Sequence, residues 1–149
     1  WTDGTIGAVQ HSDASFCCCA PDKNRWLLDE AAAGGGIWDV GGYPVSRARL
    51  VASAQLGRRN EPTLLAATGS ITHNVDEWAA ASLQFEGGIT AHVRCGVLMS
   101  EEERVVIHGS EGTIQLQTPW VVELDIRPVI RVCRVGDPVQ QIECPAGSA

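Results

Sequence analysis

The alternation of apolar and polar residues divides the chain into a helical part and a strand-rich part. Residues 5–19 (TIGAVQHSDASFCCC) mix polar and apolar positions and predict a first strand. Residues 20–36 are rich in charged and small residues and predict a loop. Apolar positions then recur at helical spacing from about Gly36 to Gln55, which predicts one helix, with Gly57 as its C-terminal cap.

Strand patterns dominate the rest of the chain. Residues 63–74 predict one strand, and residues 76–99 predict a hairpin that turns at the sequence EGG, where glycine permits positive φ. A second hairpin is expected to turn at residues 109–112 (GSEG), and two further strand patterns follow it. One helical unit followed by about six or seven strands predicts an α+β fold, an open, largely antiparallel β-sheet with its helices packed on one face.

Composition favours a folded domain and excludes two classes of partner. The 149 residues are 44% hydrophobic and 19% charged, which is ordinary for a single globular domain. The formal net charge of −7 argues against nucleic acid, which requires a basic surface. No apolar run approaches the roughly 18 residues of a membrane-spanning helix. We therefore expect a cytoplasmic protein with no membrane partner.

The cysteines and histidines show no recognisable spacing. No CxxC pair and no HExxH motif occurs, so the sequence predicts no metal site, and buried reduced thiols are favoured over disulfides. The residues concerned are Cys17, Cys18, Cys19, Cys95, Cys133 and Cys144, with His11, His73, His92 and His108.

The predicted helix contains residues that helices disfavour. Gly41 and Gly42 each cost about 1 kcal/mol in a helix interior, and Pro44 costs about 3 kcal/mol. Three consecutive glycines precede the helix and allow its backbone to approach another group closely. Because the first N–H groups of a helix have no intrahelical partner, Gly35 and Gly36 are candidates to hold a polar group or the edge of a cofactor. The pattern is neither a P-loop nor a dinucleotide fingerprint.

Asp39 and Tyr43 are the candidate catalytic residues. Their spacing of four places both on one face of a helix. The functional interpretation is a carboxylate that accepts a hydrogen bond from a substrate hydroxyl, beside a phenol that donates or relays a proton. An acidic residue at a helix start and a half-buried Tyr fit the same spacing without any function. In the preceding loop, Arg25 and Trp26 are candidates for substrate contact, with a solvated loop as the alternative.

Residues 33–49, AGGGIWDVGGYPVSRAR, resemble the helix signature GGGxxxDxGxY/H of the glucose–fructose oxidoreductase/inositol dehydrogenase (Gfo/Idh/MocA) family. The stretches DGTIGAV, NRW, VDEWAAASLQFEGGITA and VVIHGSEGTIQLQTPW resemble other parts of that family's C-terminal domain, in the same order. The resemblance covers about residues 2–125. The Tyr form of the signature is similar to that of dihydrodiol and xylose dehydrogenases.

The resemblance implies a setting for these residues. Family members pair an N-terminal Rossmann domain, which binds NAD(P), with a C-terminal α+β domain, and the active site lies between the two. Carried over, Asp39 orients the hydroxyl of a sugar, polyol or diol substrate. Tyr43 stands where the family's proton-transfer His or Tyr stands, beside a Lys of a Glu-Lys-Pro motif in the first domain. The open sheet of the family often forms subunit contacts, which implies a homo-oligomer.

Several parts of the family pattern are absent from the 149 residues, among them the Rossmann fingerprint and the Glu-Lys-Pro motif. The chain also opens at Trp1 without a Met. We therefore interpret residues 1–149 as a single C-terminal substrate-binding and oligomerisation domain of a longer NAD(P)-dependent dehydrogenase, inactive when isolated. The alternative is a truncated, non-catalytic homologue that acts as a dimerisation or interaction module.

Overall fold

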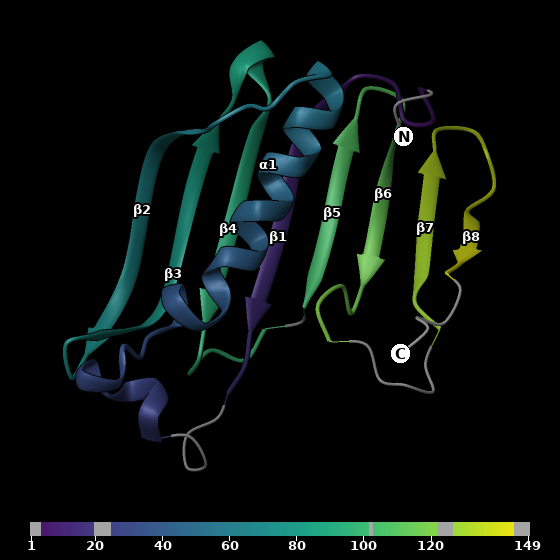
Figure 1. The fold of residues 1–149 in the computed structure, drawn as a ribbon. Coiled ribbons are helices and arrows are strands. Elements are labelled where there is room, and N and C mark those ends of the chain that lie inside the picture. The colour runs from purple at the N-terminus through teal and green to yellow at the C-terminus, as the bar shows by residue number, and fades with distance from the viewer. Residues whose placement is uncertain (1–3, 20–24, 102, 122–126, 145–149) are drawn as a thin grey trace.

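One eight-stranded sheet forms the body of the protein, and one long helix lies across it (Figure 1). The computed structural model describes residues 4–19, 25–101, 103–121 and 127–144. The strands are β1 (Val9–Cys17), β2 (Thr63–Thr72), β3 (Val75–Gln84), β4 (Thr90–Gly96), β5 (Arg104–Gly109), β6 (Gly112–Gln117), β7 (Val129–Arg134) and β8 (Gln140–Glu143). The predicted α+β class is confirmed, as are the turns of the two hairpins.

The first strand occupies the middle of the sheet, in the order β2-β3-β4-β1-β5-β6-β7-β8. β1 runs parallel to β4 and antiparallel to β5, and every other pair of neighbours is antiparallel. The parallel pair is possible because a long helical connection and the β2–β3 hairpin separate β1 from β4. β1 begins at Val9 rather than near residue 5, because residues 4–7 form a turn in which Gly4 and Gly7 have positive φ.

The connection after β1 begins with two short 3₁₀ turns, η1 (Arg25–Leu28) and η2 (Glu30–Ala32). A π-helical turn, η3 (Ile37–Gly41), then leads into α1 (Gly42–Leu56). A further 3₁₀ turn, η4 (Glu86–Gly88), joins β3 to β4.

The predicted helix from about Gly36 to Gln55 is confirmed in its extent, but its first turn is π-helical rather than α-helical. Pro44 has no N–H with which to bond the Val40 carbonyl, so the α-helical pattern is already interrupted where η3 ends. At the other end of α1, Gly57 adopts a left-handed conformation and caps the helix, as predicted.

The core lies between α1 and the sheet. The buried face of α1 is made of small residues, with Ala48 and Ala52 almost fully buried beside Val51. These residues pack with Ala14 of β1 and Val93 of β4 in one apolar cluster. Small side chains on the helix allow a close approach to the strands, and burial of this face is the main stabilising contribution. No helix among the described residues is long and apolar enough to cross a membrane.

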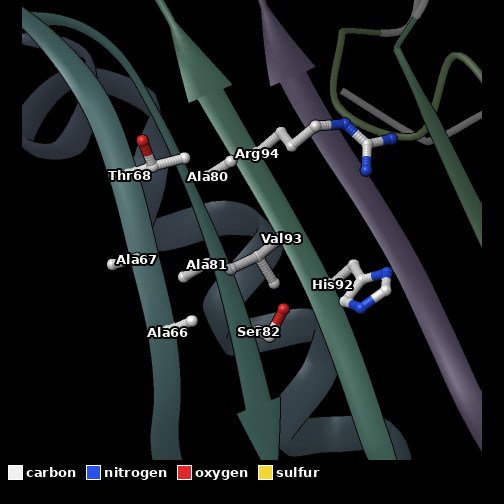
Figure 2. A pocket seen from close by; sticks show the side chains of 9 residues that line it. All are labelled: Ala66, Ala67, Thr68, Ala80, Ala81, Ser82, His92, Val93 and Arg94. Atoms are coloured by element: carbon white, nitrogen blue, oxygen red, sulfur yellow. The ribbon is translucent and has the colours of Figure 1, made fainter.

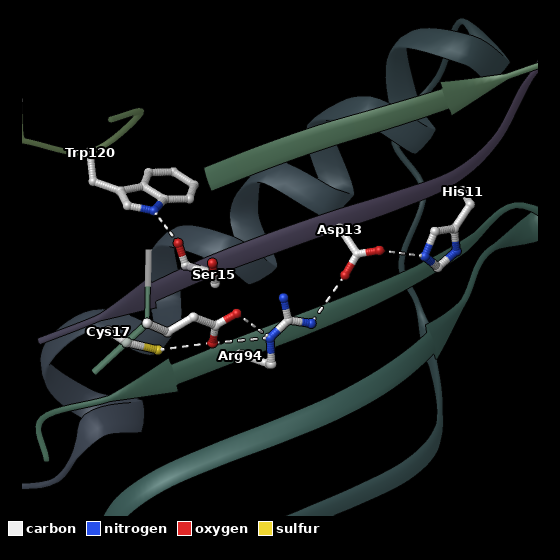
Figure 3. A network of polar contacts seen from close by, with 7 residues as sticks. His11, Asp13, Ser15, Cys17, Arg94 and Trp120 are labelled. Carbon is white, nitrogen blue, oxygen red and sulfur yellow. Dashed lines mark hydrogen bonds and ion pairs between the residues drawn. The ribbon is translucent and has the colours of Figure 1, made fainter. Parts of the chain in front are cut away.

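The opposite face of the sheet carries a connected set of polar side chains (Figure 3). Arg94 donates from Nε to the two carboxylate oxygens of Glu101 at 2.9 and 3.1 Å, and from Nη1 to Asp13 Oδ1 at 3.1 Å. The other oxygen of Asp13 lies 3.1 Å from His11 Nε2. Burial would raise the pKa of Asp13, but the hydrogen bonds from Arg94 and His11 outweigh it and lower that pKa. We call this surface the open face.

A shallow hollow of about 300 Å³ lies on the open face beside this network, over β2, β3 and β4 (Figure 2). Its floor is formed by short side chains, including Ala66, Thr68 and Ala80, and His92 and Arg94 stand at its edge on β4. The small residues on two adjacent strands produce the hollow because taller side chains of β4 flank them.

All six cysteines are free, in agreement with the prediction of reduced thiols. Only Cys17 and Cys95 are buried, and Cys19 is exposed, so the expected burial is confirmed for a minority of them. Burial is the largest cause that raises the pKa of Cys17, to about 12, and that of Cys95, to about 11.

The glycine loop before η3 is packed too closely for side chains. A Cβ on Gly34 would lie 2.5 Å from the Leu27 carbonyl oxygen, and one on Gly36 would lie 3.0 Å from Gly96 Cα in β4. These approaches are to backbone atoms, which cannot move aside as a flexible side chain can. The loop therefore fixes the start of η3 against the end of β4.

The substitution Gly34→Ala should lower the free energy of unfolding by about 2 kcal/mol, because the methyl group must displace the Leu27 carbonyl. Gly42→Ala is the matched control, since its Cβ would meet nothing within 4 Å and its φ of −61° suits a helix. That variant should be as stable as the parent or more stable by up to about 1 kcal/mol. Urea unfolding followed by tryptophan fluorescence measures both, and equal stabilities would contradict the packing argument.

Candidate functional site

Asp39 lies in the π-turn η3, beside the end of β1. Its backbone N–H bonds the Gly35 carbonyl at 3.0 Å, and its side chain is half-buried. Burial, and after it the negative charge of Asp39, raise the pKa of Cys18, which follows β1 directly. The neighbouring Trp38 is 80% exposed. The carboxylate is thus close to the end of β1 and near a surface that solvent reaches.

Tyr43 stands at the start of α1 and is held by two aromatic rings. Its ring contacts Phe16 of β1 edge to face, with 5.2 Å between centroids, and Trp120 at 5.9 Å. Phe16 and Trp120 are themselves stacked at 5.8 Å, and the Trp120 indole N–H donates to the Ser15 carbonyl at 2.7 Å. These contacts restrict the Tyr43 ring while half of its surface stays exposed.

A cavity of about 280 Å³ adjoins Tyr43. It is formed between α1 and the segment after β6, with Ser46 and Arg47 on one side and Pro119 and Trp120 on the other. The Arg47 guanidinium lies over the Trp120 ring, 5.7 Å from its centroid. A phenol, a hydroxyl, a cation and an aromatic face therefore line a space close to the size of a small-molecule site.

Gly35 and Gly36 are occupied by contacts within the protein. Gly35 has a φ of 114°, and a Cβ there would lie 2.5 Å from the carboxylate of Asp76. The same carboxylate accepts a hydrogen bond from the Ile37 N–H at 2.8 Å, at the start of η3. The position that was predicted to hold a polar group or the edge of a cofactor is therefore occupied by the protein's own carboxylate, and a phosphate cradle does not fit here. A cofactor contact at Gly35 and Gly36 stays a prediction.

The remaining predicted residues lie in η1. Trp26 is 51% exposed, and η1 packs against β3. The side chain of Arg25 lies outside the described residues. Asp39 and Tyr43 thus each lie near the end of β1, Asp39 close to Cys18 and Tyr43 against Phe16, whereas Trp26 belongs to the part of the connection that borders β3.

Three residues of this region were not singled out as site residues by the sequence. Phe16 and Trp120 brace Tyr43, and Asp76 caps η3. The alternating pattern of β1 places Phe16 on the face that α1 covers, which is a usable signal. Trp120 and Asp76 have no such signal, because they reach the site only through the pairing of strands distant in sequence.

Comparison with known proteins agrees with the family resemblance. A family model described as the GFO/IDH/MocA C-terminal domain matches residues 1–115. The trans-1,2-dihydrobenzene-1,2-diol dehydrogenase of Mus musculus is 29% identical over 118 residues, which cover 78% of this chain and 34% of that protein. An uncharacterized oxidoreductase of Rhizobium meliloti is 28% identical over 119 residues, with the same coverage of both chains. The chain thus spans about a third of the length of these relatives.

Solved structures show the same fold. KijD10, a 3-ketoreductase from Actinomadura kijaniata in complex with NADP and TDP-benzene, matches 97% of this chain and 43% of its own, with a TM-score of 0.81 and 23% identity. An aldose-aldose oxidoreductase from Caulobacter crescentus, complexed with glycerol, matches 99% of this chain and 42% of its own, with a TM-score of 0.73 and 21% identity. Together with the family model, which covers most of the sequence, these findings identify the chain as a C-terminal domain of the GFO/IDH/MocA oxidoreductase family.

Proposed function

We propose that this chain is the substrate-binding domain of an NAD(P)-dependent oxidoreductase that acts on a hydroxyl group of a sugar, polyol or diol. The observation that carries the proposal is the placement near the end of β1 of both a half-buried carboxylate, Asp39, and a phenol, Tyr43, that borders a cavity. The names of the relatives support the substrate class, since they include a diol dehydrogenase, a 3-ketoreductase and an aldose-aldose oxidoreductase.

In the proposed reaction the chain positions the hydroxyl and handles its proton. Asp39 accepts a hydrogen bond from a substrate hydroxyl and so fixes the orientation of the reacting carbon. Tyr43 takes the proton of the hydroxyl that is oxidised, or returns it in the reverse direction. Arg47 lines the same cavity as Tyr43. The braced ring keeps the phenol in place without further rearrangement.

NAD(P), when bound, would supply the hydride acceptor of such a reaction. KijD10 and its variants were solved with NADP, which supports this class of cofactor. The described residues of this chain offer the proton-handling pair and the cavity, whereas the start of η3 is closed by Asp76. We therefore assign dinucleotide binding mainly to an N-terminal domain of a longer protein.

Exposed apolar side chains around the site support the presence of such a domain. Ile37, Trp38 and Leu50 are 55%, 80% and 51% exposed. An apolar cavity of about 280 Å³ also lies between the start of α1 and strands β2 to β4, with Ile37, Pro44 and Leu64 in its lining. Large exposed apolar groups beside a reactive pair are typical of a surface that another domain covers.

The catalytic assignment predicts a loss of turnover in the full-length protein that carries this chain. Tyr43→Phe and Asp39→Ala should each lower kcat about 100-fold or more, because proton transfer and substrate orientation are removed, while cofactor affinity is retained. Steady-state kinetics with a diol or aldose and a cofactor-binding titration measure the two quantities. Asp137→Asn, in the turn between β7 and β8, is the matched control and should keep full activity. An unchanged kcat in both site variants would contradict the catalytic assignment of Asp39 and Tyr43.

We propose a second role for the open face, as the contact with a second copy of the chain. The specific observation is the hollow over β2–β4, where the short side chains of β2 and β3 leave a shallow, nearly flat surface beside His92 and Arg94 of β4 (Figure 2). A flat sheet face of this kind can pack on its own copy about a two-fold axis. In the alternative interpretation, a non-catalytic homologue that acts as an interaction module, this contact between two copies is the whole function.

The dimer proposal predicts that Ala80→Lys, which places a long cation in the hollow beside Arg94, converts the dimer to a monomer. Ala31→Lys, exposed in η2 and away from the sheet, should leave the dimer intact. Size-exclusion chromatography with light scattering gives the mass of each. A monomeric parent chain, or a dimer that Ala80→Lys does not disturb, would contradict the assignment of this face.

A further inference from the structure

Three histidines and one aspartate meet at the centre of the open face. His11 and Asp13 project from β1, His92 from β4 and His108 from β5. The ring centroids of His11 and His92 are 4.7 Å apart, and those of His11 and His108 are 5.8 Å apart. The register explains the cluster, because Asp13 pairs with His92 and His11 pairs with His108. Residues that are paired or two apart in neighbouring strands share one face of the sheet.

The spacing of the ligand atoms suits a single metal ion. His11 Nε2 lies 3.1 Å from Asp13 Oδ2. Two ligands of one tetrahedral Zn²⁺, each at about 2.0–2.1 Å, lie about 3.3 Å from each other. The available atoms of His11, Asp13 and His92 all lie within 4.8 Å of one another. His92 is exposed, so rotation of its side chain can close the remaining gap without moving the sheet.

The neighbours of the cluster resemble the supporting groups of known metal sites. His11 Nδ1 is hydrogen-bonded to the Thr90 hydroxyl at 2.8 Å, which holds the ring and leaves Nε2 directed at Asp13. Arg94 bonds the other oxygen of Asp13, so this carboxylate is oriented, and a cation that replaces the proton between His11 Nε2 and Asp13 Oδ2 binds both atoms. Ligating imidazoles and carboxylates are commonly held by such hydrogen bonds through their second polar atom.

We propose that His11, Asp13 and His92 form a binding site for one divalent transition-metal ion of the Zn²⁺ type. Two imidazoles and one carboxylate are a nitrogen-rich ligand set, which suits Zn²⁺, Co²⁺ or Ni²⁺, whereas Mg²⁺ and Ca²⁺ need mostly oxygen ligands. Water or His108 completes the coordination. The bound ion links β1 to β4, the parallel pair at the centre of the sheet. The proposal is independent of the catalytic role of Asp39 and Tyr43, which lie on the helix side, but it shares His92 with the hollow of the proposed dimer contact.

Titration of the chelator-treated chain with Co²⁺ and Zn²⁺ tests the proposal. We expect one equivalent of either ion to bind, as measured by calorimetry with Zn²⁺ and by visible absorption with Co²⁺. The Co²⁺ spectrum should lack thiolate charge-transfer absorption, since the site contains no cysteine. Zn²⁺ should also raise the melting temperature, because it binds only the folded arrangement of these strands.

The substitution His92→Ala is the decisive variant, because the side chain is exposed and its loss leaves the fold intact. It should weaken Zn²⁺ binding at least about tenfold and remove the rise in melting temperature. His73→Asn is the matched control: it also removes one exposed imidazole, and Asn tolerates the positive φ of 53° at that turn position. Absence of binding to the parent chain, a thiolate signal with Co²⁺, or equal affinity in His92→Ala and His73→Asn would each overturn the site.

Discussion

The hydrogen bond from the Ile37 N–H to the Asp76 carboxylate determines where the helical connection meets the sheet. Asp76 belongs to β3, and the glycine loop has to pass close to both this side chain and the end of β4 to reach it. A side chain at Gly35 would meet Asp76, and one at Gly36 would meet Gly96, so either would push the start of η3 away from the strands. Because η3 continues directly into α1, the positions of Asp39 and Tyr43 depend on this one approach of loop to sheet.

The Asp76 carboxylate also explains why the start of η3 differs from a free helix N-terminus, at which an anion can bind. A free helix N-terminus attracts phosphate because its N–H groups lack partners. Here the partner is an acid of the same chain, held two strands away from β1. The glycines therefore serve close packing within the domain, and the reactive groups are displayed one turn further on, where Trp38 and Tyr43 are exposed.

The central strand β1 places different kinds of side chain on the two faces of the sheet. Ala14 and Phe16 point to the helix side, where Phe16 supports Tyr43 and packs against Val40. His11 and Asp13, which precede them in the same strand, belong to the polar network of the open face (Figure 3). The period of two along a strand makes this division unavoidable, since each residue faces opposite to its neighbour. A strand at the sheet centre thus contributes to the proposed active site on one side and to the histidine cluster on the other.

The local pattern of the sequence was sufficient for the strands, the two hairpin turns, the αL cap at Gly57 and the signature that contains Asp39 and Tyr43. Each of these depends on residues within a few positions of one another, where backbone preference and side-chain period act directly. The Asp76 cap of η3, the contact of Trp120 with Tyr43 and the meeting of His11 with His92 depended on the tertiary structure alone. Residues about 40 to 105 apart come together there, because strand pairing and register join them, and no local pattern specifies which strands become neighbours.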